Sequence, residues 1–105
     1  MNVVIVNFAL DGMSDAEYIE MCDHLAPGVA AIDGLLSKVW LSDPDTNTFG
    51  GVYLFDSPTA VELFFGSQLF ADVASHPNLV GAHATRFGVL EAPTRVTRGF
   101  VTSDV

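Results

Sequence analysis

Hydrophobic residues first gather in residues 2–10, a run rich in β-branched side chains that ends at Asp11-Gly12. This pattern is typical of a buried strand followed by a turn. From Ser14 onward the spacing changes to intervals of three and four, giving one apolar stripe that extends to residue 32 (Tyr18, Met21, Cys22, Leu25, Val29 and Ile32). Because Ser14 and Glu17 have the capping-box spacing, we predict a helix that begins there and turns this stripe toward a core.

Pro27 lies inside the same stripe, next to Gly28. Proline removes a backbone donor and disturbs the preceding turn of a helix. We therefore expect the helix to kink or split near His24.

Two further apolar runs, residues 35–42 and 49–56, are separated by a segment dense in turn-forming residues (Asp43-Pro44-Asp45-Thr46-Asn47-Thr48). The separation leaves no room for a helix, so the runs predict an antiparallel hairpin. Ser57-Pro58 then predicts the start of a second amphipathic helix, which Gly66 interrupts and which continues briefly to residue 73. Residues 79–90 predict a fourth strand, and residues 91–105 remain as a tail.

This order of elements is that of an α+β ferredoxin-like βαββαβ domain, with a four-stranded antiparallel sheet covered by helices on one face. We expect a single domain over residues 1–105. Apolar residues occupy both parities of the first three strands, so the second face of the sheet should also be buried. A second copy of the chain covers such a face most economically, which predicts a homodimer with the tail against the partner.

The charge and hydrophobic composition of the chain argue against several classes of binding partner. Four Lys and Arg residues against thirteen Asp and Glu give a formal net charge of −9, which disfavours nucleic acid and anionic membranes as partners. No apolar stretch approaches the roughly 18 residues of a membrane span. Cys22 is the only cysteine, so no intrachain disulfide is possible, and the first residues lack the features of a secretory signal. We expect a cytoplasmic protein.

The hairpin region also carries a family pattern. Gly-Leu-Leu-Ser-Lys-Val-Trp at 34–40 and Gly-Gly-Val-Tyr-Leu-Phe-Asp at 50–56 resemble the YdhR-like monooxygenase family, as do Asn-Phe-Ala-Leu-Asp-Gly at 7–12 and the segment 87–93. The resemblance implies a dimeric α/β barrel similar to the antibiotic-biosynthesis monooxygenase superfamily. Better-understood members of that superfamily oxidise polycyclic phenols with molecular oxygen and without metal or flavin. Asn7 stands where a histidine is expected from one relative, which removes one candidate base.

Against this background the chemistry is expected on the hairpin. Lys38 is a candidate anion stabiliser, Tyr53 a hydrogen-bond donor to a ligand oxygen, and His24, beside the expected kink, a candidate base. The candidate substrate-binding residues are Trp40, Phe55, Asn7, Arg86 and Phe64. Strand register decides whether Trp40 and Tyr53 share a face, and the sequence leaves it open.

Other interpretations remain open at this point. Trp40 and Tyr53 also suit simple core packing, Lys38 a position at the sheet edge, His24 the protein surface, and Asn7 an interface hydrogen bond. The histidines lack the spacing of a metal site, so we expect neither metal nor other cofactor. The favoured function is a cofactor-independent monooxygenase that uses molecular oxygen on an aromatic or polyketide-like molecule. An isomerase or cyclase using the same pocket, or a non-catalytic binding dimer, are the alternatives.

Overall fold

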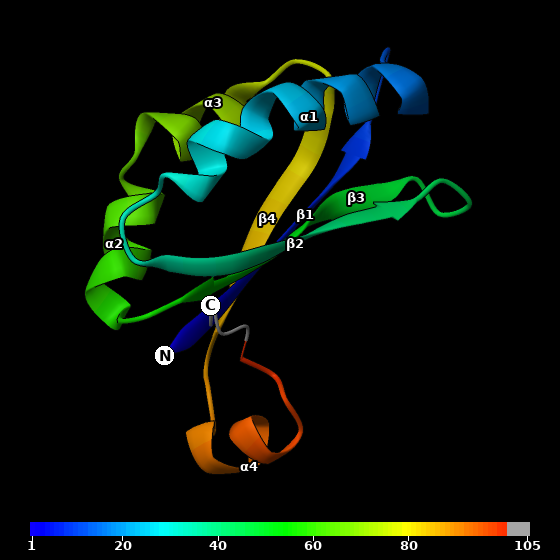
Figure 1. Ribbon diagram of the computed structural model, residues 1–105. Coiled ribbons are helices and arrows are strands. Elements are labelled where there is room, and N and C mark those ends of the chain that lie inside the picture. Colours follow the sequence, from blue (N-terminus) through cyan, green and yellow to red (C-terminus); the bar gives the residue numbers. More distant parts are fainter. Residues whose placement is uncertain (101–105) are drawn as a thin grey trace.

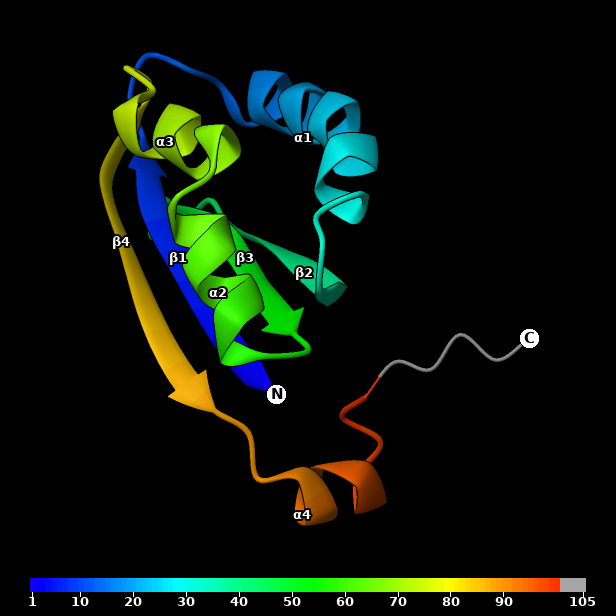
Figure 2. The ribbon, with the colours of Figure 1, turned by 90° about the vertical axis from the view of Figure 1, so that its left-hand side faces the viewer.

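The computed structural model describes residues 1–100 of the chain. It contains four strands and four helices, in the order β1 (Asn2–Leu10), α1 (Asp15–Ala30), β2 (Leu35–Asp43), β3 (Thr48–Phe55), α2 (Pro58–Phe65), α3 (Gln68–Ser75), β4 (Leu79–Gly88) and α4 (Glu91–Val96). The strands form one antiparallel sheet in the order β2-β3-β1-β4. Helices α1, α2 and α3 cover one face of this sheet (Figures 1 and 2). The ferredoxin-like prediction is confirmed.

The first helix begins where the sequence predicts. The Ser14 hydroxyl accepts from the Glu17 backbone N–H, and the Glu17 carboxylate accepts from the Ser14 N–H, which completes the capping box. Pro27 does not split the helix, which is continuous to Ala30. Its C-terminal turns bend down toward the start of β2 in Figure 2.

The second helical region differs from the expected interrupted helix, because α2 and α3 are two separate helices. Gly66 ends α2, and the Ser67 hydroxyl caps α3 by accepting from the Phe70 backbone N–H. A new N-cap directly after a terminating glycine lets the chain change direction between the two helices.

The C-terminal region also departs from the prediction. The fourth strand ends at Gly88 rather than at residue 90, and residues 91–96 form the short helix α4 where only a tail was expected. Residues 101–105 of that tail, with Val101 among them, lie outside the described part of the chain.

The core lies between the sheet and the three covering helices. Alternate residues of β1 and β3 point into it, and the side chains that are almost fully excluded from solvent are Phe49, Phe55, Val4 and Val61. The opposite parity points to the other face of the sheet, where one cross-strand row joins Val39, Val52, Ile5 and Thr85. On this face Val39 keeps 59% and Phe87 52% of its surface exposed. In residues 1–100 no helix is long and apolar enough to cross a bilayer.

Candidate active site

The register of the β2–β3 hairpin answers the question that the sequence leaves open. Lys38 lies directly opposite Tyr53, and Trp40 lies opposite Gly51. Positions 38 and 40 have the same parity along β2, so Lys38, Trp40 and Tyr53 all share the face that the helices cover. The hairpin therefore brings an amine and two aromatic rings together beneath α1.

Lys38 extends across these two rings. Its Nζ lies 3.3 Å from the centroid of the Trp40 ring and 4.5 Å from that of Tyr53. Gly51 makes this path possible, because a Cβ at that position would stand 2.5 Å from Lys38 Cε. The ammonium group thus lies against aromatic faces, a favourable cation–π arrangement.

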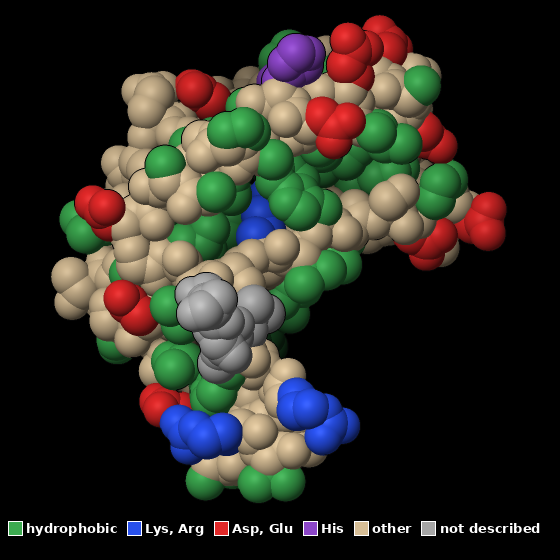
Figure 3. Space-filling model, viewed as in Figure 1, with side chains coloured by type: hydrophobic (Ala, Val, Ile, Leu, Met, Phe, Trp, Pro, Cys, Tyr) green, Lys and Arg blue, Asp and Glu red, His purple; other side chains and the backbone are tan. Residues whose placement is uncertain are grey.

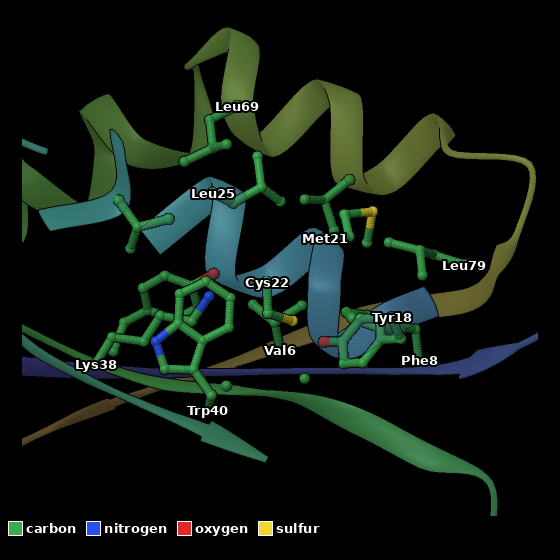
Figure 4. Close-up of a pocket in the computed structure, with 15 residues that line it drawn as sticks. Val6, Phe8, Tyr18, Met21, Cys22, Leu25, Lys38, Trp40, Leu69 and Leu79 are labelled. Carbon is green, nitrogen blue, oxygen red and sulfur yellow. The ribbon is translucent and has the colours of Figure 1, made fainter. Parts of the chain in front are cut away.

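Around these side chains is a small, largely enclosed cavity of about 30 Å³, lined from β1, β2, β3, α1 and α3 and by Leu79 at the start of β4. Figure 4 shows Lys38 and Trp40 beside each other on the sheet side, with Cys22 and Tyr18 of α1 across from them. A cavity of this size has room for ordered water but not for a ring system.

Two larger clefts flank Trp40 between α1 and β2. One, of about 300 Å³, is lined by α1 residues and by Trp40, Leu41 and Ser42. The other, of about 290 Å³, is lined by the C-terminal half of α1 and by residues 35–38 and Trp40. Lys38 lines both this second cleft and the enclosed cavity. Figure 3 shows a basic side chain at the bottom of a hollow rimmed by hydrophobic side chains.

The apolar surroundings change the acid–base properties of the site. Burial lowers the pKa of Lys38 from 10.5 to about 8, with a small opposing effect from Cys22. Within residues 1–100 no carboxylate oxygen lies within 4.0 Å of its Nζ. Burial also raises the pKa of Tyr53 to about 12 and raises the pKa values of Tyr18 and Cys22. At neutral pH the site therefore holds protonated hydroxyl and thiol groups beside an amine that exchanges its proton readily.

Two of the predicted site residues lie elsewhere. His24 is exposed on α1 and lines neither the enclosed cavity nor the two clefts. Asn7 has the opposite parity to the buried residues of β1, and its amide donates to the Phe49 carbonyl at 3.5 Å. The structure does not bring either of them to Lys38.

Three more of the predicted site residues, Phe55, Phe64 and Arg86, do not line the clefts beside Trp40. Phe55 and Phe64 are buried in the core, where the Phe55 ring stacks parallel to Tyr53 at 6.0 Å and the Phe64 ring packs at 4.8 Å from it. Arg86 is on the helix-covered face at the exposed end of β4 and pairs with Glu62 of α2. These phenylalanines fix the Tyr53 ring, whereas Arg86 already has its counterion.

Sequence reasoning did not assign several residues that line the cavity. Tyr18, Cys22 and Leu25 were recognised only as part of the apolar stripe, and Gly51 only as part of a family pattern. The available signal was the pair Gly50-Gly51 within an otherwise apolar strand, since glycine within a strand often marks a close approach of other groups.

Comparison with known proteins shows the family of the chain. The model of the family described as putative mono-oxygenase ydhR matches residues 3–100. The chain belongs to the ydhR family. No curated protein matches its sequence.

Solved structures show the same fold at low sequence identity. A putative antibiotic biosynthesis monooxygenase from Deinococcus radiodurans has 18% identity and a TM-score of 0.70 over 88% of this ydhR-family chain and 95% of the other. The haem degrader MhuD from Mycobacterium tuberculosis, solved with two haems bound, has 21% identity and a TM-score of 0.68 over 86% and 96%. A mutant of SnoaB, a cofactor-independent oxygenase from Streptomyces nogalater, has 18% identity and a TM-score of 0.66 over 86% and 94%.

No group of three or more metal-ligating side chains occurs within the described residues of this ydhR-family protein. None of its histidines lines the enclosed cavity or the two clefts beside Trp40. The titratable side chains that line the enclosed cavity are Lys38, Tyr18, Tyr53 and Cys22, and Asp23 lines the cleft of about 300 Å³.

Trp40 is the only tryptophan of the ydhR-family chain and reports directly on Lys38. Loss of the proton at Nζ removes a positive charge 3.3 Å from the indole, so the fluorescence should change with a midpoint at pH about 8. The measurement is a fluorescence titration from pH 6 to 10, with Lys38→Met as the control that removes the transition. An unchanged transition in Lys38→Met would assign it to another group.

Proposed function

We propose that the protein is a monooxygenase that oxidises a small aromatic molecule through its phenolate or enolate form, using molecular oxygen without metal or flavin. Membership of the ydhR family supports the reaction class. The observation that carries the proposal is the position of Lys38, a half-buried amine without a carboxylate partner in residues 1–100, stacked on Trp40 beside a cleft.

Lys38 suits the first chemical step. A neutral amine whose pKa lies near the working pH takes the proton from an acidic ring hydroxyl, and the resulting ammonium holds the phenolate by a charge-assisted hydrogen bond. With its pKa at about 8, Lys38 supplies both forms. This role needs no contribution from His24, which lies on the exposed side of α1.

The electron-rich anion then transfers an electron to oxygen, and the two radicals combine at the ring carbon. Loss of water from the peroxide leaves a carbonyl: a ring CH₂ and one O₂ give C=O and H₂O. In this proposal the Trp40 ring stacks on the substrate ring. Tyr53, which keeps its proton because its pKa is about 12, lines the enclosed cavity behind Lys38 and neither cleft, so its ring holds the Lys38 amine in place while the Lys38 ammonium stabilises the developing oxyanion.

The test is oxygen consumption with a graded panel of one-, two- and three-ring phenols and anthrones. We expect uptake of one O₂ per product, with one atom of isotopically labelled oxygen in the product and the other in water. Lys38→Met should lose most of the activity, while His24→Ala, a change at an exposed position outside the clefts, should retain it.

Each alternative gives a different result in the same assay. Conversion that is equally fast without oxygen would contradict the oxygenase and indicate an isomerase or cyclase. Binding of the panel without conversion would indicate a non-catalytic binding protein.

We further propose that the working form is a homodimer joined through the sheet face that the helices leave uncovered. The row of Val39, Val52 and Ile5 across this face and the exposed Val39 and Phe87 side chains support a second copy of the chain as the partner. Light scattering should give twice the chain mass. Val39→Asp should produce monomers, whereas Leu63→Asp, at an equally exposed leucine of α2, should not; a monomeric wild type would contradict the proposal.

A further inference from the structure

The Lys38 amine lies in apolar surroundings at the wall of a cleft, an environment that stabilising a substrate anion does not require. It is the only lysine of the chain, and it reaches from β2 into apolar surroundings bounded by Trp40, Tyr53 and Cys22. It also lines the cleft of about 290 Å³ between β2 and the C-terminal half of α1. A molecule bound in this cleft would meet one primary amine at its inner wall.

We propose that this cleft binds small aromatic aldehydes and that Lys38 captures them reversibly as a Schiff base. This goes beyond the proposed oxygenase activity and does not depend on it.

The chemistry balances without another reactant. The nitrogen lone pair of the neutral amine attacks the carbonyl carbon, and the carbonyl oxygen takes up a proton to give a carbinolamine. The C–O bond then breaks, water leaves, and a C=N bond remains. No electron is gained or lost overall, so neither an oxidant nor a reductant is needed.

The site favours both the reactant and the product of this step. The attacking amine must be neutral, and burial lowers the pKa of Lys38 to about 8, so that roughly a tenth of it is neutral at pH 7. The protonated imine carries the same single positive charge as the ammonium, so it retains the cation–π contact with Trp40. Burial keeps the Cys22 thiol protonated, which limits its competition for the carbonyl.

The dimensions of the cleft select the ligand. At about 290 Å³ it lies at the lower end of the range of small-molecule sites, about 300–1,000 Å³, and it is lined mainly by alanine, valine and leucine side chains. Such a cleft accommodates a single aromatic ring, which packs against the apolar side chains of α1 and β2 while its aldehyde substituent points to Lys38.

The test traps the imine in the full-length protein with benzaldehyde and cyanoborohydride, followed by peptide mass spectrometry. We expect benzylation at Lys38 with a rate that saturates with benzaldehyde concentration and depends on pH with a midpoint of about 8. Toluene, which has the ring without the carbonyl, should slow this labelling by competition.

Two amines serve as references. The Met1 amine is in the same molecule, and an exposed lysine is supplied by Glu20→Lys in a Lys38→Arg background. Both should label linearly with benzaldehyde concentration and without protection by toluene. At pH 7 the lysine created at position 20 should label at least about tenfold more slowly than Lys38, because far less of an ordinary lysine is neutral.

Labelling of Lys38 that is linear, insensitive to toluene, or no faster than that of the reference lysine would overturn the proposal. So would a complete absence of label at Lys38 while Met1 reacts. Since the assay needs no oxygen and no turnover, its failure leaves the oxygenase proposal standing, and the converse also holds.

Discussion

Gly50→Ala should unfold the protein or destabilise it by at least about 3 kcal/mol. Gly50 has φ +149°, a conformation that L side chains rarely adopt, and a Cβ there would stand 1.8 Å from the Val6 carbonyl oxygen. Backbone strain costs about 1–3 kcal/mol and overpacking about 1–3 kcal/mol more. Since the obstacle is the backbone of β1 rather than a flexible side chain, the Asn7–Gly50 pairing in the centre of the sheet would have to break.

The matched control is Gly28→Ala. Gly28 lies inside α1, and nothing stands within 4 Å of an added Cβ. The same substitution there should stabilise the fold by about 0.5–1 kcal/mol, because alanine is the better helix former. Urea unfolding of both variants measures the difference. A Gly50→Ala protein within about 1 kcal/mol of the wild type would show that β1 and β3 have room to separate.

Gly51, the neighbour of Gly50, lies on the same strand but has a different effect on the site. Its closest contact would be Lys38 Cε, the flexible part of a side chain, so a methyl group there displaces the amine rather than the sheet. The two adjacent glycines therefore have different roles. Gly50 allows β1 and β3 to pair closely, and Gly51 leaves space for the Lys38 side chain to cross Trp40.

The order of helices and strands was predictable from the sequence because short sequence motifs determine where most of them begin and end. The capping box at Ser14 and Glu17 and the turn formers between the hairpin strands act over a few residues and need no tertiary information. The separate start of α3 could also have been found, because Ser67 directly follows the glycine that ends α2.

The arrangement of the site was predictable only in part. Lys38, Trp40 and Tyr53 were named from residue chemistry, but their common face follows from a register that long-range pairing sets. His24 was selected for its place near Pro27, whereas the helix continues through that proline and turns His24 outward. Predicting which α1 residues line the cavity would have required the angle at which α1 crosses the sheet, and hydrophobic periodicity does not supply that angle.

Lys38→Met should change stability and activity in opposite directions. Methionine has a similar length and fills the same apolar path without a charge. Burying a charge that has no counterion is unfavourable, so at pH 7 the variant should be more stable than the wild type by about 1 kcal/mol or more. Activity should fall by roughly 10²–10³-fold, the loss typical when one group that stabilises a developing anion is removed.

The pH dependence of the stability difference between the wild type and Lys38→Met distinguishes the removal of a buried charge from an improvement in packing. The pKa of Lys38 is lowered from 10.5 in the unfolded chain to about 8 in the fold. Between these values the unfolded state binds a proton that the folded state does not, so the wild type gains stability as pH rises from 8 toward 10.5. Its disadvantage relative to Lys38→Met should therefore be constant below pH 8 and shrink above it.

Urea unfolding at pH 7 and pH 10 and kcat/KM measured at pH 7 test both halves of the prediction. Lys38→Arg is the control, because it keeps a charge that does not become neutral in this range and should not become more stable. A stability gain in Lys38→Met that is the same at both pH values would assign the effect to packing. If Lys38→Met keeps its activity, Lys38 has no essential role in the reaction, because the substrate anion would then be stabilised without the only lysine of the chain.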